Sequence, residues 1–220
     1  MPGWPCSPRP ATIDDMGYEW ATAARSDEAG RFGTEAFYAS LGRAFVTMCA
    51  VIPALFLIEV IDIGLGPGTL DLAGGIIPRS VEGIDGILFS PFLHDGWEHL
   101  YGNAVPLILL GTFVLAGGAR RFIWSTVLIM AVAGVGVWFI GDPGTVVVGA
   151  SGVIFGYLGL LLARGVVERS WWHFAVAAFI GLLYWYQLFN VLPTDQRISW
   201  QGHLLGLLGG VVAAVVFRRR

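Results

Sequence analysis

Charged side chains are scarce in this chain of 220 residues, and lysine is absent altogether. Only 13% of the residues are charged, against about a quarter in an average soluble domain, so an ordinary water-soluble globule is excluded. All 13 basic residues are arginine, which excludes chemistry that depends on a lysine amine. The net charge of −3 gives no indication of a nucleic-acid partner.

Cysteine is also rare. Cys6 lies in a polar N-terminal segment and Cys49 in an apolar run, so neither a disulfide scaffold nor a cysteine metal site is indicated. The first residues lack the basic head, short apolar core and small-residue cleavage site of a signal peptide. We expect no metal and no organic cofactor.

Apolar residues, in contrast, make up 55% of the chain, and five runs approach the roughly 20 residues that cross a bilayer. A sixth run is shorter, and we interpret it as a helix whose outer end begins below the membrane surface. The expected spans are 44–64, 97–117, 121–140, 149–163, 171–192 and 201–217. The chain is therefore predicted to be an all-α membrane protein, a bundle of six transmembrane helices.

Arginine is distributed unevenly over the connections between these runs. Eleven of the 13 lie before the first span, in the second-to-third and fourth-to-fifth connections, or at the C-terminus. Because arginine favours the cytosolic side, both termini are predicted to be cytosolic and the loop 65–96 external. Residues 1–43 are expected to form a cytosolic tail with one helix around 30–41, and residues 44–220 the membrane domain. The arginine usage and the missing targeting segment favour a bacterial cell membrane.

Four polar residues fall inside the apolar runs: His99 and Asn103, Ser151, and His203. At 1.5 Å per helical residue, Asn103, Ser151 and His203 lie roughly 20–22 Å above the cytosolic ends of their helices. Each one alone has an ordinary explanation, such as a serine that bonds back to its own helix. Together they place a nucleophile, a base and oxyanion donors at one depth.

Glycines accompany these residues on both helices. Gly149 and Gly152 flank Ser151, where they allow close backbone approach and leave the Ser151 N–H near a helix N-terminus. Small-residue faces include Gly152 on one helix and Gly206 on another, and such faces let helices approach closely in lipid. This proximity predicts that His203 lies within hydrogen-bond reach of Ser151.

Three segments resemble the signature motifs of the rhomboid intramembrane serine proteases. Residues 94–103 read H-x4-H-x3-N, residues 149–152 read G-x-S-G, and residues 203–210 read H-x2-G-x3-G. They occur in this order on the second, fourth and sixth expected spans. The resemblance covers about residues 44–220.

The resemblance implies a role for each matching residue. Ser151 would be the nucleophile and His203 the general base and acid, a dyad because no acid accompanies the histidine. His99, Asn103 and the Ser151 N–H would form the oxyanion site, with His94 supporting it. The implied substrates are membrane proteins, cut from the external side in or near a transmembrane helix at a small residue.

Two positions depart from the family pattern. Rhomboids commonly have tyrosine four residues after the nucleophile, packed on the base, whereas this chain has Phe155. The ring can still stack on His203, but the hydroxyl is lost. Many members also have a Trp-Arg pair nine residues before the first histidine of the signature, where this chain has Asp85 and Gly86.

Three other functions compete with this interpretation. An inactive rhomboid-like protein would bind membrane helices without cutting them, although such proteins lose the serine or the histidine. A metal-dependent protease is suggested by His94, Glu98 and His99, but H-x-x-x-E-H is one residue too long for the known zinc motif. A transporter would use histidine and asparagine as a relay, but the chain lacks the internal repeat typical of many transporters.

Overall fold

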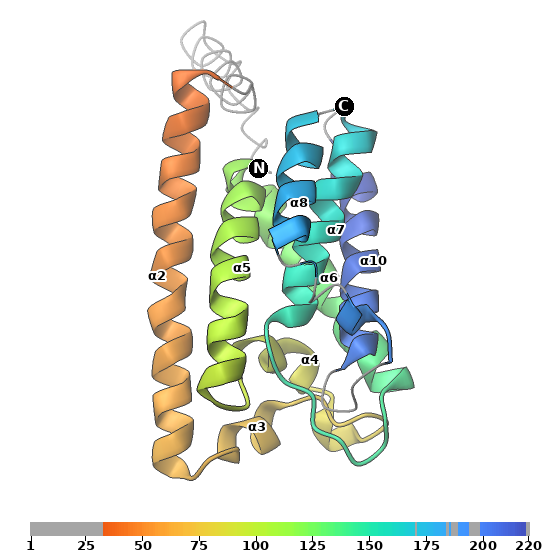
Figure 1. Cartoon of the computed structure of the whole chain (residues 1–220). Helices are drawn as coiled ribbons and strands as arrows, with labels where there is room; N and C mark the ends of the chain where they lie inside the picture. Colours follow the sequence, from red (N-terminus) through yellow and green to blue (C-terminus); the bar gives the residue numbers. More distant parts are fainter. Residues whose placement is uncertain (1–32, 170, 184, 186–188, 194–198, 219–220) are drawn as a thin grey trace, which may run out of the picture.

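The computed structural model describes residues 33–169, 171–183, 185, 189–193 and 199–218, and within them regular structure is helical apart from one isolated β-bridge (Figure 1). The all-α class is therefore confirmed. The described part leaves out residues 1–32, which are most of the expected tail. It also leaves out 184 and 186–188, near the end of the expected span 171–192. The same holds for Arg197, one of the two arginines in the connections that we predict to be external.

The first long helix, α2 (Glu35–Leu65), has 31 residues and stands at one side of the bundle (Figure 1). It begins after Thr34, whose hydroxyl accepts a hydrogen bond from the Phe37 N–H at 3.1 Å, as is typical of a helix N-cap. The segment 35–41, which we expected to belong to a helix of the tail, is thus continuous with the first expected span.

The other long helices overlap the remaining apolar runs. They are α5 (Gly96–Ala116), α6 (Ala119–Ile140), α7 (Ser151–Val167), α8 (Trp171–Leu183) and α10 (Trp200–Val216). In the described part of the chain, α2, α5 and α6 are long and apolar enough to cross a membrane, whereas α7, α8 and α10 are shorter apolar helices. Many apolar side chains on the outside of the bundle are exposed, for example Val46, Leu182 and Val216.

The centre of the bundle is the packing of α10 against α7 and α6, with α2 against α5 at one side. Glycines bring the backbones of α7 and α10 into direct contact. A Cβ atom added to Gly206 would overlap the carbonyl oxygen of Gly152, and one added to Gly210 would overlap that of Gly156. This close approach agrees with the small-residue faces in the sequence.

At one end of the bundle, which we call the loop end, two connections meet. The first, 66–95, contains four short helices: α3 (Thr69–Gly74), η1 (Val81–Gly83), α4 (Gly86–Phe89) and η2 (Ser90–Phe92). The second, 141–150, leads into α7. An isolated antiparallel bridge between Ile76 and Val147 joins the two connections.

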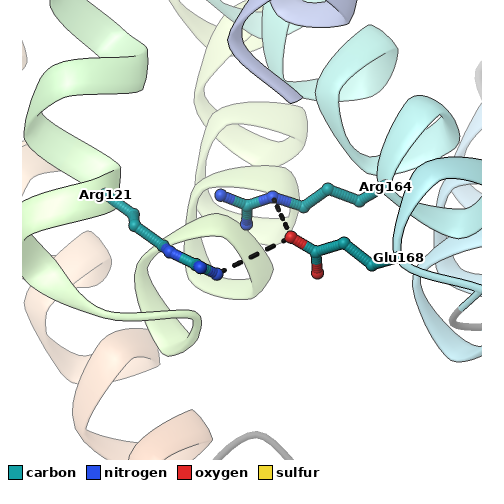
Figure 2. A network of polar contacts seen from close by, with 3 residues as sticks. All are labelled: Arg121, Arg164 and Glu168. Atoms are coloured by element: carbon teal, nitrogen blue, oxygen red, sulfur yellow. Dashed lines mark ion pairs between the residues drawn. The ribbon is translucent and has the colours of Figure 1, made fainter. Parts of the chain in front are cut away.

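At the opposite end, which we call the arginine end, only two residues separate α5 from α6 and three separate α7 from α8. Figure 2 shows Glu168 there between two guanidinium groups. Its Oε1 lies 3.7 Å from Arg121 Nη1 and 3.9 Å from Arg164 Nε, and the Arg164 side chain is only 1% exposed. Glu168 thus places a negative charge beside the buried guanidinium of Arg164, which lowers the cost of burying it.

Candidate active site

Ser151 is the first residue of α7, and its side chain is half-buried. The preceding residues Gly149 and Ala150 end the connection from the loop end. Since the first N–H groups of a helix have no acceptor within the helix, the Ser151 main chain lies where developing negative charge is stabilised.

Gly149 has a φ of +115°, a conformation that side-chain-bearing residues rarely adopt. A Cβ atom at this position would lie 2.6 Å from both Cε1 and Nε2 of His99 and 3.6 Å from Nδ2 of Asn103. The two side chains of α5 therefore lie directly against the backbone that precedes Ser151. Glycine is needed there for its conformation and for space.

Asn103 lies on α5 and is 6% exposed. Its Nδ2 is buried and has no hydrogen-bond partner within the described residues. Buried amide donors usually have an acceptor, so this donor is available to an oxygen that enters beside Gly149. An oxygen that develops negative charge beside Gly149 would satisfy it.

His94 precedes α5 in the chain and is 2% exposed. Its ring packs edge-on against His99 with centroids 5.2 Å apart, and its Nε2 accepts a long hydrogen bond of 3.5 Å from the Ala150 N–H. Burial, reinforced by the neighbouring His99, lowers the pKa of His94 to about 3. The imidazole is thus neutral near pH 7, as an acceptor for the Ala150 N–H must be.

His203 lies on α10, is 6% exposed and stacks on Phe155 of α7, with ring centroids 4.4 Å apart and an interplanar angle of 15°. Phe155 follows Ser151 by four residues, so the two share a face of α7. The imidazole therefore packs on the face that carries Ser151. The tyrosine hydroxyl is absent, but the ring contact with His203 is present.

The structure also accounts for the other departure, Asp85-Gly86. Gly86 begins α4 and is buried, and a Cβ atom there would overlap the carbonyl group of Gly75. A large side chain does not fit at this point, because the backbone of α4 packs directly on the segment that pairs with Val147.

Ser90, which no sequence motif indicated, contacts the backbone just before Ser151. Its carbonyl oxygen accepts a hydrogen bond of 2.8 Å from the Gly149 N–H, which ties the connection 141–150 to the end of the connection 66–95. The bond uses main-chain atoms, so no pattern of side chains could have indicated it.

The structure is a bundle of apolar helices in which His94 and His99 lie against the backbone before Ser151, and His203 packs on the face of α7 that carries Ser151. The family model of the Rhomboid domain matches residues 82–220. An uncharacterized protein of Mycobacterium tuberculosis is 38% identical over 176 residues, which are 76% of this chain and 72% of that protein. The chain therefore belongs to the rhomboid family.

Two further relatives match this chain, and one of them is named as a rhomboid-like protease. An uncharacterized protein of Mycobacterium leprae is 38% identical over 177 residues, which are 77% of this chain and 69% of that protein. A protein of Toxoplasma gondii named rhomboid-like protease 5 is 30% identical over 131 residues, or 57% of this chain and 15% of the relative. Membership of this family suggests intramembrane protease activity.

Proposed function

We propose that this chain is an intramembrane serine endopeptidase in which Ser151 is the nucleophile and His203 the general base. The observation that carries the proposal is the stacking of His203 on Phe155, one helical turn from Ser151 on the same face of α7. The backbone contact between α7 and α10 at Gly152 and Gly206 supports it, since it brings the two helices together beside the serine.

In the proposed reaction, Ser151 Oγ attacks the carbonyl carbon of a peptide bond while His203 takes the hydroxyl proton. The tetrahedral intermediate collapses as His203 returns that proton to the leaving amine, and an acyl-serine remains. Water then attacks the ester with His203 again as base, and the serine is regenerated. Phe155 holds the imidazole ring in place in this dyad.

The proposed oxyanion site consists of the Ser151 N–H and the side chains of His99 and Asn103. Asn103 Nδ2 is a buried donor beside Gly149, so it requires no reorganisation when the charge develops. One such donor typically contributes about 3–4 kcal/mol to the stabilisation of the transition state. His94 supports the site by accepting from the Ala150 N–H.

We further propose that α2, α5, α6, α7, α8 and α10 form the six transmembrane helices, with both termini cytosolic in a bacterial cell membrane. The 17 residues of α7 span about 25 Å, less than the roughly 30 Å of a bilayer core. Ser151 would therefore lie below the outer surface of the membrane. Residues 1–43 would form the tail and residues 44–220 the protease domain.

The proposed substrates are membrane proteins cleaved in or near a transmembrane helix. The carbonyl groups of a helix are hydrogen-bonded within it, so the substrate has to unwind locally before Ser151 can attack. Small and helix-weakening residues near the cut would favour this step.

Labelling with a serine-directed fluorophosphonate tests the proposal. The full chain in detergent should form an adduct on Ser151, and both Ser151→Ala and His203→Ala should abolish labelling and the cleavage of a transmembrane substrate. His173→Ala, a histidine at the arginine end, is the matched control and should label normally. Thermal unfolding checks that each variant is folded. Cleavage by Ser151→Ala at the wild-type rate would refute the assignment of Ser151 as the nucleophile. A wild type that neither labels nor cleaves would indicate a non-cleaving rhomboid-like protein.

A further inference from the structure

Arg79 joins the connection 66–95 to the C-terminal end of α6. Its main-chain N–H donates to the Trp138 carbonyl oxygen at 2.9 Å, and its guanidinium Nη2 donates to the Gly141 carbonyl oxygen at 2.8 Å. The last carbonyl groups of a helix have no donor within the helix and favour a nearby cation. Helix α6 has no basic residue in its own last turn, so Arg79 supplies one from elsewhere in the chain.

At the same junction, a side chain of α6 also donates to the connection 66–95. The Trp138 Nε1 donates to the Ser80 carbonyl oxygen at 2.7 Å, and Pro78 packs so closely that a Cβ atom on Gly141 would lie 2.6 Å from its Cγ. Arg79 itself has a φ of +61°, which is uncommon for a residue other than glycine. The local backbone is therefore bent to bring the main-chain donor and the guanidinium to α6 together.

The residues after Gly141 lead directly to Ser151. The connection 66–95 forms main-chain hydrogen bonds with them at two further points. Ile76 and Val147 exchange two main-chain hydrogen bonds of 2.9 Å each, and the Gly149 N–H donates to Ser90 at 2.8 Å. The final attachment is two residues before Ser151. It fixes the peptide against which His99 and Asn103 lie.

We infer that Arg79 is a positioning residue for the active site. By fixing the connection 66–95 on the end of α6, it sets where Val147 and Gly149 are held and so how the Ser151 backbone faces His99 and Asn103. This inference rests on the proposed function for its kinetic consequence. The structural consequence, an ordered 141–150 connection, is independent of catalysis.

The experiment compares Arg79→Ala and Arg79→Lys in the full chain in detergent. Glu82→Ala is the matched control, since Glu82 is an exposed charged residue in the same connection. For each variant we would measure the rate of fluorophosphonate labelling of Ser151 per folded molecule, kcat and KM for a transmembrane substrate, and amide hydrogen exchange of residues 142–150. The exchange measurement reports directly on the main-chain donors of Val147 and Gly149.

Arg79→Ala should label Ser151 roughly ten- to a hundred-fold more slowly, the scale expected when a reacting group is misplaced by up to about 1 Å. The loss should fall on kcat with KM nearly unchanged, and exchange at Val147 and Gly149 should be faster. Arg79→Lys, which keeps a cationic donor, should recover most of the rate, and Glu82→Ala should behave like the wild type.

A normal labelling rate in Arg79→Ala, accompanied only by a lower Tm, would overturn the inference and leave Arg79 a purely structural contact.

If the wild type does not label at all, the proposed function fails, and hydrogen exchange alone decides the inference. Unchanged exchange in Arg79→Ala then refutes the positioning role, and faster exchange supports it. Should Arg79→Ala fail to fold, Arg79→Lys and Trp138→Phe replace it. Trp138→Phe removes the Nε1 donor to Ser80 together with part of the ring, and we expect faster exchange at Val147 and Gly149, with wild-type exchange counting against the inference.

Discussion

At the loop end, the connections 66–95 and 141–150 are joined by main-chain hydrogen bonds, and Gly86 lets the backbone of α4 touch Gly75 within the first of them. At the arginine end, the connections are short turns, and the contact shown in Figure 2 is made by charged side chains, Glu168 with Arg121 and Arg164. The two connections at the loop end are thus joined to each other by main-chain atoms, whereas the contact in Figure 2 depends on charge.

The difference follows from what each end has to do. Main-chain hydrogen bonds are directional and short, so they fix the peptide before Ser151 in one conformation. Ion pairs between long side chains tolerate variation in distance, and the pairs at Glu168, 3.7 and 3.9 Å long, are adequate to neutralise a buried guanidinium. The comparison predicts that variants at the two ends lose different properties.

The largest effect is expected from Gly210→Ala, at the contact between α7 and α10. The added methyl group would overlap the Gly156 carbonyl oxygen, and a backbone atom cannot rotate away as a side chain can. Overpacking of this kind costs about 3 kcal/mol, and unfolding in detergent would measure it. Gly42→Ala is the control, because a Cβ atom there meets nothing within 4 Å, and it should be neutral or slightly stabilising. Equal stability of the two variants would show that the helices can separate without loss.

Glu168→Gln should affect stability and leave catalysis intact. It removes the carboxylate charge beside the buried Arg164, and an interaction with a charged group contributes about 1.5–3 kcal/mol. Unfolding in detergent should show the loss, while labelling of Ser151 per folded molecule stays at the wild-type rate. Glu82→Gln, an exposed residue at the loop end, should change neither. A reduced labelling rate in Glu168→Gln would mean that the two ends are coupled.

Phe155→Leu should show the reverse pattern, because it removes the aromatic ring but keeps most of the volume of this buried side chain. Stacked aromatic pairs contribute about 0.5–1.5 kcal/mol beyond the area they bury, so loss of the ring on His203 should slow cleavage roughly two- to tenfold. Phe155→Tyr keeps the ring and should retain the wild-type rate within about a factor of two. An equal loss of activity in both variants would show that packing volume, rather than stacking, is what matters at this position.

The smallest effect is a pH dependence at Asp71 of α3. Burial, followed by the charges of Asp62, Asp95 and Glu59, raises the pKa of Asp71 from 3.8 to about 7. The folded protein therefore binds the Asp71 proton more tightly than the unfolded chain does. As a result, the free energy of unfolding falls as pH rises from about 4 to about 7.

Asp71→Asn should remove this slope and make the protein more stable than the wild type above pH 7, by on the order of 1 kcal/mol. Tm measured between pH 5 and 8 tests it. A wild-type curve parallel to that of Asp71→Asn would show that the carboxyl group titrates normally. Exposed Asp85 offers a control, and Asp85→Asn should leave the slope in place.

Much of the helical architecture could be read from the sequence, because apolar length and composition act locally along the chain. The expected runs 97–117, 121–140 and 201–217 match α5, α6 and α10 within two residues at either end. The continuity of α2 through residues 35–43 could not be read in this way. That segment has a charged residue at each end, Glu35 and Arg43, and its helix begins at the Thr34 cap and packs through buried Phe37.

The sequence by itself singled out the residues to which we assign the proposed chemistry, since Ser151, His203 and Asn103 are polar side chains in apolar runs and their cost in lipid makes them conspicuous. Only the tertiary structure decided how those groups are held. Gly149 is hydrogen-bonded to Ser90, which lies 59 positions earlier in the chain. Arg79 is hydrogen-bonded to Gly141, which lies 62 positions later. These bonds use main-chain acceptors, which every residue has, so they leave no trace in the order of the amino acids.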